Sequence, residues 1–363
     1  MKILIDGIPR DIGGIGTLII NIVNYNAKSD KKIDFDFLVP KKSQYTSVLE
    51  QKGYRYFEVP KVCTKEYKNK VSKVFNDNLY DYVWINNTSK INIALPREAK
   101  KYGVKVIMHS HGVAAEERGL KWLVFKVIEK IQEKKYCSLI DIPFACSETS
   151  AEFFYTEELR KKCVIVSNGI EVEKFLFNQK NREVIRKELN MKDNDVVLGA
   201  VGRLTNVKNY SFLIKLMPEL NDNVKLLILG DGEDFHLLQG LIRDLNLSNR
   251  VFLLGKHTDV ERYLSAMDIF MMPSLNEGLP FSLVEAQANG LKCLVSTGVT
   301  EEAKLTTEVI FIDLNDKQAW ISAVNKALPT IEYRVNANKE ICRAGFSIDH
   351  SYKNFVKRLE ERD

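Results

Sequence analysis

Short apolar runs alternate with longer helical stretches along the whole chain, and this alternation limits the possible folds more than any other feature. In the first half, seven predominantly apolar runs are bounded by polar residues, as is typical of buried strands. Amphipathic stretches such as 17–26 and 92–102 lie between several of them. Strands that alternate with helices predict βαβ units and a mostly parallel sheet. The seven runs are Lys2–Asp6, Phe35–Val39, Tyr56–Val59, Tyr82–Asn86, Val104–His109, Ile142–Cys146 and Val164–Ser167.

The pattern starts again after a polar stretch at residues 175–195. A chain of 363 residues is long enough for two hydrophobic cores. We therefore predict an α/β protein with two Rossmann-like, doubly wound domains, residues 1–175 and 176–346, that face each other across a cleft. A helix over residues 347–363 ends the chain. Six further strands are expected at Val196–Val201, Val224–Leu229, Val251–Leu254, Ile269–Met272, Leu291–Val295 and Val309–Ile312.

The composition is that of an ordinary globular protein, with 45% hydrophobic and 28% charged residues. Six cysteines are scattered without a C-x-x-C pair, which favours buried thiols in a reducing compartment. The N-terminal apolar run stops at Asp6 and is too short for a signal peptide, and no apolar run approaches the length of a membrane span. We therefore expect a cytoplasmic protein.

Positive charge is concentrated in the first half of the chain. Residues 1–175 carry a net charge of +7 and residues 176–363 a net charge of −2. A basic half can meet lipid headgroups, nucleic acid or an acceptor that bears pyrophosphate. Residues 118–131 also alternate basic and apolar side chains at helical spacing, which suits peripheral contact with the inner membrane face. The alternative is a helix packed on its own domain with its lysines outward.

Two glutamates frame the segment 273–286, P-S-L-N-E-G-L-P-F-S-L-V-E-A. Glu277 is expected in the loop at the carboxyl end of a strand, and Glu285 about one turn into the following helix. Ligands of open α/β sheets bind at that edge, and ionised carboxylates accept hydrogen bonds from hydroxyl groups. The segment therefore predicts a site for a hydroxyl-rich ligand. The alternative for an isolated pair of glutamates is a solvated helix face.

A second motif, G-R-L-T-N-V-K-N, follows the first strand of the second half. Gly202 allows a tight turn, and Arg203 and Lys208 are spaced to converge on a phosphate. The alternative is two solvated surface cations.

Three other loops follow predicted strands and are weaker signals. Gly230 and Gly232 open a strand-to-helix turn, and Lys256 lies in an exposed loop. Gly13 and Gly14 precede the first helix, but they lack the spacing of a dinucleotide-binding motif. Two histidines, His109 and His111, end a strand in the first half; no third metal ligand accompanies them, and a polar strand cap is the alternative.

Together these motifs resemble the family 4 retaining glycosyltransferases, in particular the bacterial capsular and exopolysaccharide branch. The resemblance is carried by G-R-L-x-x-x-K-N, the G-x-G turn, H-S-H-G, A-C-S and the E-x7-E frame E-G-L-P-F-S-L-V-E. It implies the GT-B fold, in which the last helix crosses back onto the N-terminal domain. The motif N-G-I-E at 168–171 follows Ser167, where the family usually has proline.

The resemblance also implies a role for each candidate residue. Arg203 and Lys208 would clasp the donor diphosphate, and Glu285 would bind the ribose. Glu277 and His111, with His109 as the second candidate, would contact the transferred sugar, and Lys256 the base. The other donor-binding residues implied are Gly13, Gly14, Gly202, Gly230, Gly232, Gly278 and Leu279.

The expected reaction is transfer of a hexose or N-acetylhexosamine from a nucleotide sugar, with UDP as the expected nucleotide, to a glycan or lipid-linked acceptor. No metal and no cofactor beyond the co-substrate are implied, and no nucleic acid is expected as a partner. Two alternatives stay open: a GT-B sugar-nucleotide epimerase, and a non-catalytic subunit that stabilises another transferase.

Overall fold

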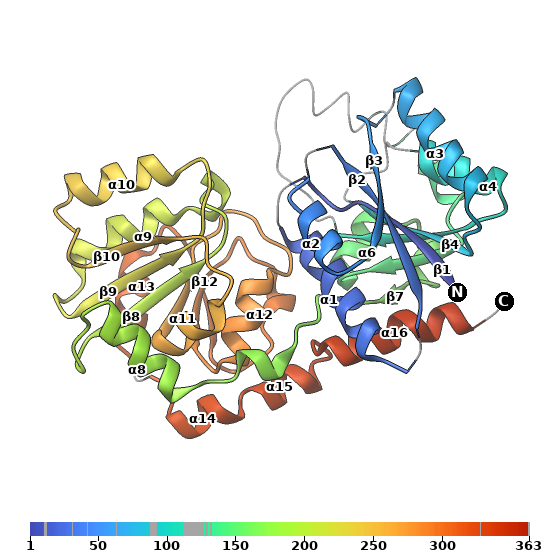
Figure 1. Cartoon of the computed structure of the whole chain (residues 1–363). Coiled ribbons are helices and arrows are strands. Elements are labelled where there is room, and N and C mark those ends of the chain that lie inside the picture. The colour runs from blue at the N-terminus through green and yellow to red at the C-terminus, as the bar shows by residue number, and fades with distance from the viewer. Residues whose placement is uncertain are drawn as a thin grey trace. The chain divides into compact units, whose positions relative to one another are not determined.

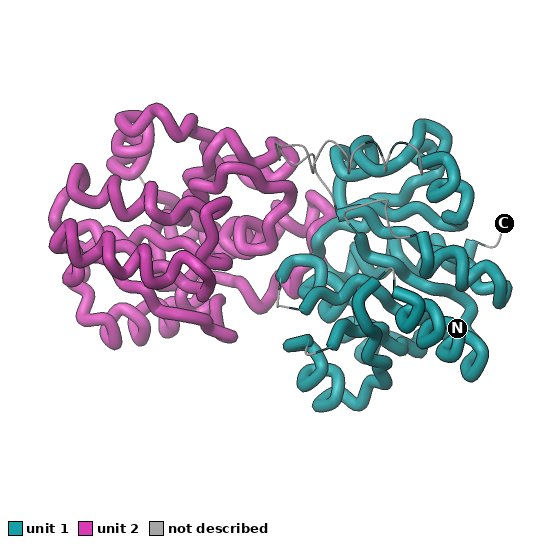
Figure 2. Tube along the Cα trace, turned by 90° about the horizontal axis from the view of Figure 1, so that it is seen from above, with its two compact units in different colours: residues 1–169, 348–363 teal, residues 170–347 magenta. Residues whose placement is uncertain are grey.

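The computed structural model describes residues 1–10, 13–30, 32–41, 43–62, 64–87, 93–111, 127, 130, 133–326 and 328–361. These residues divide into two units (Figure 2): unit 1 comprises Met1–Gly169 and Ile348–Asp363, and unit 2 comprises Ile170–Ser347. The chain thus enters unit 2 six residues before the predicted boundary at 175. The reason is apolar packing, because Ile170, Val172 and Phe175 are buried in a core of unit 2.

Unit 1 is built on a parallel seven-stranded sheet in the order β3-β2-β1-β4-β5-β6-β7. Every run predicted in the first half is a strand, with ends within two residues of the prediction. The strands are β1 (Lys2–Asp6), β2 (Asp34–Pro40), β3 (Arg55–Val59), β4 (Tyr82–Asn87), β5 (Lys105–Ser110), β6 (Ile142–Ala145) and β7 (Val164–Ile165). The helices are α1 (Gly14–Lys28), α2 (Thr46–Gln51), α3 (Lys65–Asp77), α4 (Ala94–Lys101), α6 (Glu148–Phe154), α7 (Glu157–Arg160) and α16 (Ile348–Glu360).

The C-terminal helix α16 belongs to unit 1, although unit 2 separates it from the rest of that unit in the sequence (Figure 1). It packs beside α1, and its apolar face is buried because residues three and four positions apart share one side of a helix. Phe355 is fully buried, with its ring centroid 4.6 Å from that of Trp84 on β4 and 5.5 Å from that of Phe144 on β6.

Unit 2 is built on a parallel six-stranded sheet in the order β10-β9-β8-β11-β12-β13. Its strands also lie within one residue of the predictions: β8 (Val196–Val201), β9 (Val224–Leu229), β10 (Val251–Gly255), β11 (Ile269–Met272), β12 (Lys292–Ser296) and β13 (Val309–Ile312). Its helices are α8 (Gln179–Glu188), α9 (Tyr210–Leu216), α10 (Phe235–Asp244), α11 (Val260–Ala266), α12 (Phe281–Ala288), α13 (Lys317–Val324), α14 (Ile331–Asn336) and α15 (Asn338–Arg343).

Both faces of the unit 2 sheet are covered, as the near-continuous apolar strands predict. Leu198 and Ala200 of β8 pack in a core with α9, α10 and α13, whereas Val197 faces a second core with α11 and α12. The alternation follows from the two-residue period of a strand. Figure 1 shows α9 and α10 on one side of the sheet and α8, α11 and α12 on the other.

In both sheets the strand order reverses beside the first strand of the unit. In unit 1 the reversal lies between β1 and β4, and in unit 2 it lies between β8 and β11. Ligands of open α/β sheets bind outside the carboxyl ends of the strands at such a point. The loops that follow these strands are therefore where a site is expected.

Two sequence-based expectations concern the membrane and the cysteines. Within the ranges described above, no helix combines the length and the apolar character needed to cross a bilayer. The basic segment predicted at 118–131 lies outside the described residues, apart from Val127 and Lys130. Cys137, Cys146 and Cys293 are buried, as the apolar runs around them predict.

Candidate active site

In unit 2 the loops after β8, β9 and β10 are joined by backbone hydrogen bonds. The amide of Leu204 donates to the carbonyl of Asp231 at 3.0 Å, and the amide of Gly230 donates to the carbonyl of Gly255 at 2.8 Å. Three strand ends that are far apart in the sequence therefore form one continuous surface. Backbone amide and carbonyl groups in these loops have protein partners, as buried polar groups require.

The glycines of these loops are needed for contact between the loops. A Cβ atom on Gly230 would lie 1.8 Å from the Gly202 carbonyl oxygen, and one on Gly232 would lie 2.3 Å from the Leu204 carbonyl oxygen. A Cβ atom on Gly202 would meet the hydroxyl of Tyr210 at 2.6 Å. Real Cβ atoms do not approach so closely, so a side chain at Gly230 or Gly232 would push the loops apart, and one at Gly202 would displace Tyr210. The G-x-G spacing is therefore explained by close packing between the loops. The sequence had indicated only a tight turn.

Lys208 and Glu277, two of the predicted site residues, form an ion pair. The Nζ atom of Lys208 lies 2.7 Å from Oε1 of Glu277, and both side chains are largely buried. The two loops that carry them are also joined by Asn209, whose side-chain amide donates to the Pro273 carbonyl at 3.2 Å. Asn209 has a left-handed backbone (φ 53°), a conformation that asparagine tolerates better than most residues. The structure thus brings together the G-R-L-x-x-x-K-N loop and the E-x7-E loop.

Glu277 is held by a segment that the sequence analysis did not single out. Its amide donates to the Gly298 carbonyl at 3.0 Å, and its carbonyl accepts from the Thr300 amide at 3.1 Å. A Cβ atom on Gly298 would lie 2.4 Å from the Leu275 carbonyl oxygen, so this position must be glycine for the two segments to pair. An isolated glycine after β12 signals a turn, but nothing local identifies its partner.

Glu285 lies one turn into α12, as the sequence predicts. Desolvation by burial raises the pKa of its carboxyl to about 7, with a smaller upward contribution from Glu261, while Lys174 acts in the opposite direction. Lys174 and Glu261 form their own ion pair at 3.4 Å. Neither residue was predicted as part of the site, because each lies on a different element with no motif around it. Near neutral pH, the Glu285 carboxyl is therefore close to the midpoint of its titration.

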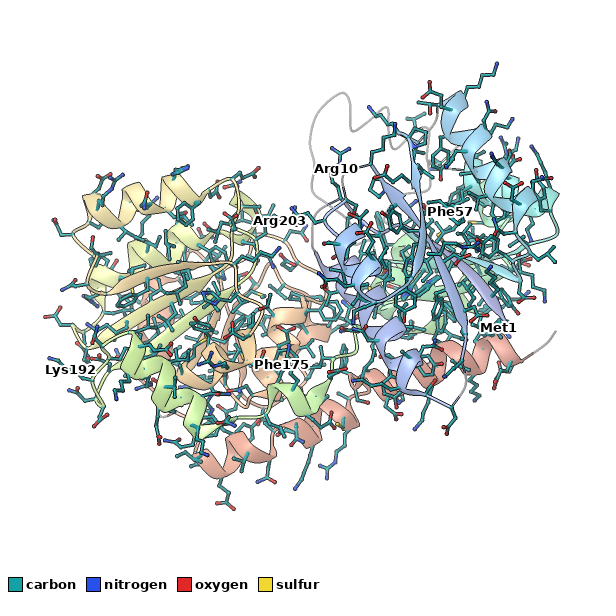
Figure 3. All side chains as sticks on the ribbon, viewed as in Figure 1. Met1, Arg10, Phe57, Phe175, Lys192 and Arg203 are labelled. Atoms are coloured by element: carbon teal, nitrogen blue, oxygen red, sulfur yellow. The ribbon has the colours of Figure 1, made fainter. Side chains whose placement is uncertain are left out.

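The remaining unit 2 candidates differ in exposure. Arg203 is exposed in the loop after β8, and Figure 3 shows it at the surface of the unit. Lys256 is exposed directly after β10. Gly278 is partly buried, and the Leu279 side chain packs in a core of unit 2. Any contact between Leu279 and a ligand would therefore involve its backbone.

In unit 1 the two predicted histidines have different surroundings. His109 has no exposed surface and packs among aromatic rings, with centroids 4.3 Å from His111 and 6.0 Å from Trp84. Burial and the neighbouring His111 hold the pKa of His109 well below its ordinary value. His109 is therefore part of the buried core, and of the two histidines only His111 has exposed surface.

His111 is held in a defined tautomer. Its Nε2 lies 3.0 Å from Oδ1 of Asn86, and the Asn86 amide nitrogen donates to the Asp6 carbonyl at 3.2 Å. Since the amide oxygen faces the ring, Nε2 carries the proton and Nδ1 is left as an acceptor. Burial lowers the pKa of His111 to about 3, so the ring is neutral at physiological pH.

The glycine pair begins α1. Gly13 is extended, and its amide donates to the Tyr45 hydroxyl at 3.1 Å, so this amide already has a protein partner. Gly14 is exposed at the first helical position, where an amide has no partner within the helix. A Cβ atom on Gly16 would lie 2.1 Å from the Tyr45 hydroxyl, so a glycine is needed at this position to leave room for the tyrosine. Gly14 thus fits anion binding better than Gly13 does.

Comparison with known proteins agrees with this geometry. Residues 181–341 match the family model "Glycosyl transferases group 1". The UDP-Gal:alpha-D-GlcNAc-diphosphoundecaprenol alpha-1,3-galactosyltransferase of Escherichia coli is 29% identical over 360 residues, covering 94% of this chain and 91% of that protein. The putative glycosyltransferase EpsF of Bacillus subtilis (strain 168) is 29% identical and covers 80% and 77%.

Among solved structures, Anabaena Alr3699/HepE in complex with UDP and glucose superposes with a TM-score of 0.80. It covers 100% of both chains at 18% sequence identity, which establishes a shared fold. The shared fold agrees with the predicted GT-B fold, since this chain has one parallel sheet in each of its two units. The sequence comparisons therefore support a glycosyltransferase of the family 4 type, and the structural comparison supports the GT-B fold.

Proposed function

We propose that this enzyme transfers a hexose or N-acetylhexosamine from a UDP-sugar to a lipid-linked glycan acceptor in surface polysaccharide assembly, with retention of anomeric configuration. The name of the Escherichia coli relative includes a UDP-linked donor and a diphosphoundecaprenol-linked acceptor. The Anabaena neighbour binds UDP together with glucose. Both support a UDP-sugar donor here.

The observation that carries the donor site is the meeting of Lys208 and Glu277 where the strand order of unit 2 reverses. A cation and a carboxylate at this position suit a ligand that has both phosphates and hydroxyl groups. Lys208 and Arg203 would stabilise the charge that develops on the leaving diphosphate, and stabilisation of this kind often contributes more to catalysis than any other effect. Glu277 would then accept hydrogen bonds from the hydroxyls of the transferred sugar.

The nucleoside would lie against the other strand ends of unit 2. Glu285, on α12, would accept hydrogen bonds from the ribose hydroxyls, and Lys256 would contact the base. Backbone groups near Gly230, Gly232 and Gly278 line the same surface. In unit 1, the unprotonated Nδ1 of His111 would accept a hydrogen bond from a sugar hydroxyl, and the Gly14 amide would suit an anionic group.

We further propose that transfer needs no divalent metal, because Arg203 and Lys208 supply positive charge at the diphosphate. Among the residues that the structure describes, no cluster of three or more His, Cys, Asp or Glu side chains is arranged to hold a metal ion. Activity should therefore survive EDTA. Complete loss in EDTA with recovery on adding Mg²⁺ or Mn²⁺ would contradict the proposal.

The deciding experiment combines binding and turnover. A thermal-shift panel of nucleotides should select UDP, since a ligand at 100 times its Kd stabilises a protein by about 2.7 kcal/mol. Incubation with UDP-sugars and a lipid-linked acceptor should then give a product whose anomeric configuration, read by NMR, matches the donor. Release of a free epimerised sugar nucleotide would instead indicate an epimerase. UDP binding without any turnover would indicate a non-catalytic subunit.

A further inference from the structure

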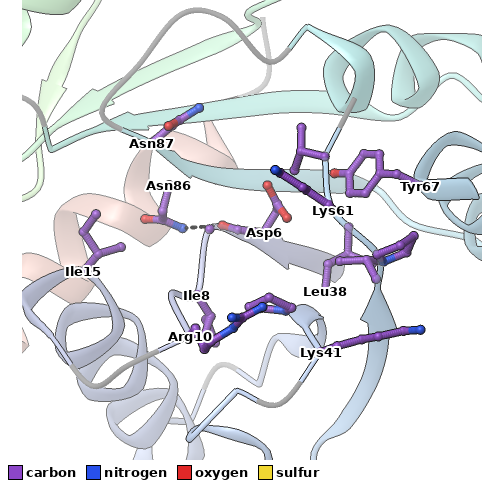
Figure 4. Close-up of a pocket in the computed structure, with 15 residues that line it drawn as sticks. Asp6, Ile8, Arg10, Ile15, Leu38, Lys41, Lys61, Tyr67, Asn86 and Asn87 are labelled. Atoms are coloured by element: carbon purple, nitrogen blue, oxygen red, sulfur yellow. Dashed lines mark hydrogen bonds between the residues drawn. The ribbon is translucent and has the colours of Figure 1, made fainter. Parts of the chain in front are cut away.

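Unit 1 contains a pocket of about 810 Å³ at the carboxyl ends of its first four strands (Figure 4). A volume of this size is typical of sites for small-molecule ligands. The pocket lies at the point where the strand order of unit 1 reverses, between β1 and β4. None of the candidate site residues named from the sequence lines it, and the donor residues of unit 2 take no part in it.

The polar groups of the pocket are of two kinds. The inner group includes the Asp6 carboxyl at the end of β1 and the Asn86 and Asn87 side chains at the end of β4. The other group consists of three exposed cations, Arg10, Lys41 and Lys61. Apolar side chains, among them Ile8, Ile15 and Leu38, form much of the remaining wall. An apolar wall with a few converging polar groups is the usual composition of a ligand site.

The cations have no acidic partner in the described part of the chain. Between described residues, no ion pair involves Arg10, Lys41 or Lys61, whereas many other basic residues of unit 1 are paired, such as Lys100 with Asp141 at 2.5 Å. Asp6 is the single acid among the described residues that line the pocket. Burial raises the pKa of its carboxyl to about 6, with the Gly7 amide acting in the opposite direction. The described lining therefore carries a net positive charge, which suits an anion.

The inner wall is rigidly connected to the predicted sugar-binding histidine. Asn86 donates to the Asp6 carbonyl and contacts His111 Nε2 through its side-chain oxygen. A Cβ atom on Gly7 would lie 2.0 Å from the Asn86 carbonyl oxygen, so β1 and β4 approach too closely here for any other residue. One amide side chain thus fixes both the pocket wall and the orientation of His111.

We propose that this pocket binds the sugar diphosphate end of the acceptor, with Arg10, Lys41 and Lys61 contacting the phosphates and Asp6 accepting a hydrogen bond from a sugar hydroxyl. This inference rests on the proposed function and adds the substrate class: an acceptor sugar attached directly to a diphosphate, and not a neutral glycan end. Arginine and lysine are the usual partners of phosphate oxygens.

The experiment uses three probes with the full chain at saturating UDP, which occupies the diphosphate site of unit 2. They are decyl-diphosphate-linked α-N-acetylglucosamine, the neutral decyl glycoside of the same sugar, and inorganic pyrophosphate. The variant K41Q/K61Q should weaken binding of both diphosphate probes by about tenfold or more, since charge-assisted hydrogen bonds are lost. Its affinity for the neutral glycoside should stay unchanged. D6N should weaken both sugar-bearing probes and should not weaken pyrophosphate, because removal of a carboxylate makes the site more positive.

The matched control is K52Q/K70Q, which removes two exposed lysines of unit 1 that do not line the pocket. It has the same net charge as K41Q/K61Q, so it separates local contacts from long-range attraction. Equal weakening by both pairs, or no weakening by K41Q/K61Q, would overturn the proposal. Unchanged affinity of D6N for the sugar-bearing probes would show that Asp6 does not bind the acceptor sugar.

The two proposals can fail separately. If the wild-type chain binds UDP and transfers sugar but the pocket variants behave like the control, only the acceptor pocket is wrong. If the wild-type chain neither binds UDP nor transfers sugar, the proposed function fails, whatever the pocket binds.

Discussion

Lys208 and Glu277 have opposite charges 2.7 Å apart, so a substitution of either one changes the surroundings of the other. We predict that K208A lowers kcat by an amount equivalent to on the order of 3 kcal/mol, because a cation near the leaving diphosphate is lost. We also predict that K208A/E277Q costs less than the sum of the two single variants, because side chains in direct contact are coupled.

Steady-state kinetics of the four proteins measures this coupling, and circular dichroism checks that each one is folded. Near-wild-type turnover by K208A would show that Lys208 does not bind the diphosphate. Strict additivity would show that the ion pair has no part in catalysis.

Glu285 gives a prediction about pH. Because burial raises the pKa of its carboxyl to about 7, the group is mostly protonated at pH 6 and mostly ionised at pH 8. Ribose hydroxyls donate more strongly to the ionised carboxylate, so affinity for UDP-glucose should increase as pH rises through 7. E285Q should bind more weakly and should lose this dependence.

Calorimetry with UDP-glucose from pH 6 to pH 8 tests this, since its phosphates do not titrate in that range. E277Q is the comparison variant, because Glu277 is expected to contact the sugar: it should keep the pH dependence of binding. A wild-type affinity that is flat between pH 6 and pH 8 would be inconsistent with ribose recognition by Glu285.

The sequence could not show which contacts the candidate site residues make. The family resemblance favoured His111 over His109, but only the folded structure shows that His109 lies in the core and that His111 is partly exposed. The pairing of Lys208 with Glu277 could not be predicted from the sequence either, because the two residues lie on loops after strands β8 and β11. A local sequence pattern cannot indicate a contact between two strands that are adjacent in the sheet but far apart in the sequence.

At the scale of elements, the loops after the strands of unit 2 can approach each other closely only because they contain glycines. G230A would place a methyl group 1.8 Å from the Gly202 carbonyl oxygen, at a backbone φ of 146° that other residues avoid. We predict that G230A is destabilised and binds UDP more weakly, because the loop that carries Arg203 must shift.

The matched control is G240A, in the interior of α10, where an added Cβ meets no atom within 4 Å. It should stabilise the protein by about 0.5–1 kcal/mol, since alanine is the better helix former. Urea denaturation and UDP titration of both variants provide the test. Similar stabilities for G230A and G240A would show that the close approach of the two loops is not required.

The elements themselves could be predicted because each strand is a local signal. Val224–Leu229 and Ile269–Met272 are apolar runs with polar or glycine neighbours, and the structure gives both the same bounds. The unit 1 pocket could not be predicted, since its lining comes from the ends of four strands. Asp6 was noted only as the residue that ends an apolar run, and its proximity to Asn86 depends on the pairing of β1 with β4.

At the scale of the whole molecule, the last helix supports the first domain. We predict that F355A destabilises unit 1 by about 3–5 kcal/mol, because the loss of a fully buried ring leaves a cavity beside Trp84 and Phe144. Unit 2 should be unaffected. The control V335A removes methyl groups from an exposed position on α14 of unit 2 and should change little.

Hydrogen exchange read by mass spectrometry distinguishes the two units in one experiment. Peptides from residues 1–169 of F355A should exchange faster, whereas those from 170–347 should match the wild type. UDP affinity should also be retained. Faster exchange in both units, or in unit 2 alone, would contradict the assignment of α16 to the core of unit 1.

The place of α16 in the sequence also affects how the protein is made. A ribosome completes residues 1–169 first, then all 178 residues of unit 2, and only then Phe355. At translation rates of roughly 5–20 residues per second, the nascent first domain waits about 9–36 s for its final helix. During that time Trp84 and Phe144 lack the Phe355 ring. The second domain in the sequence can therefore finish folding before the first.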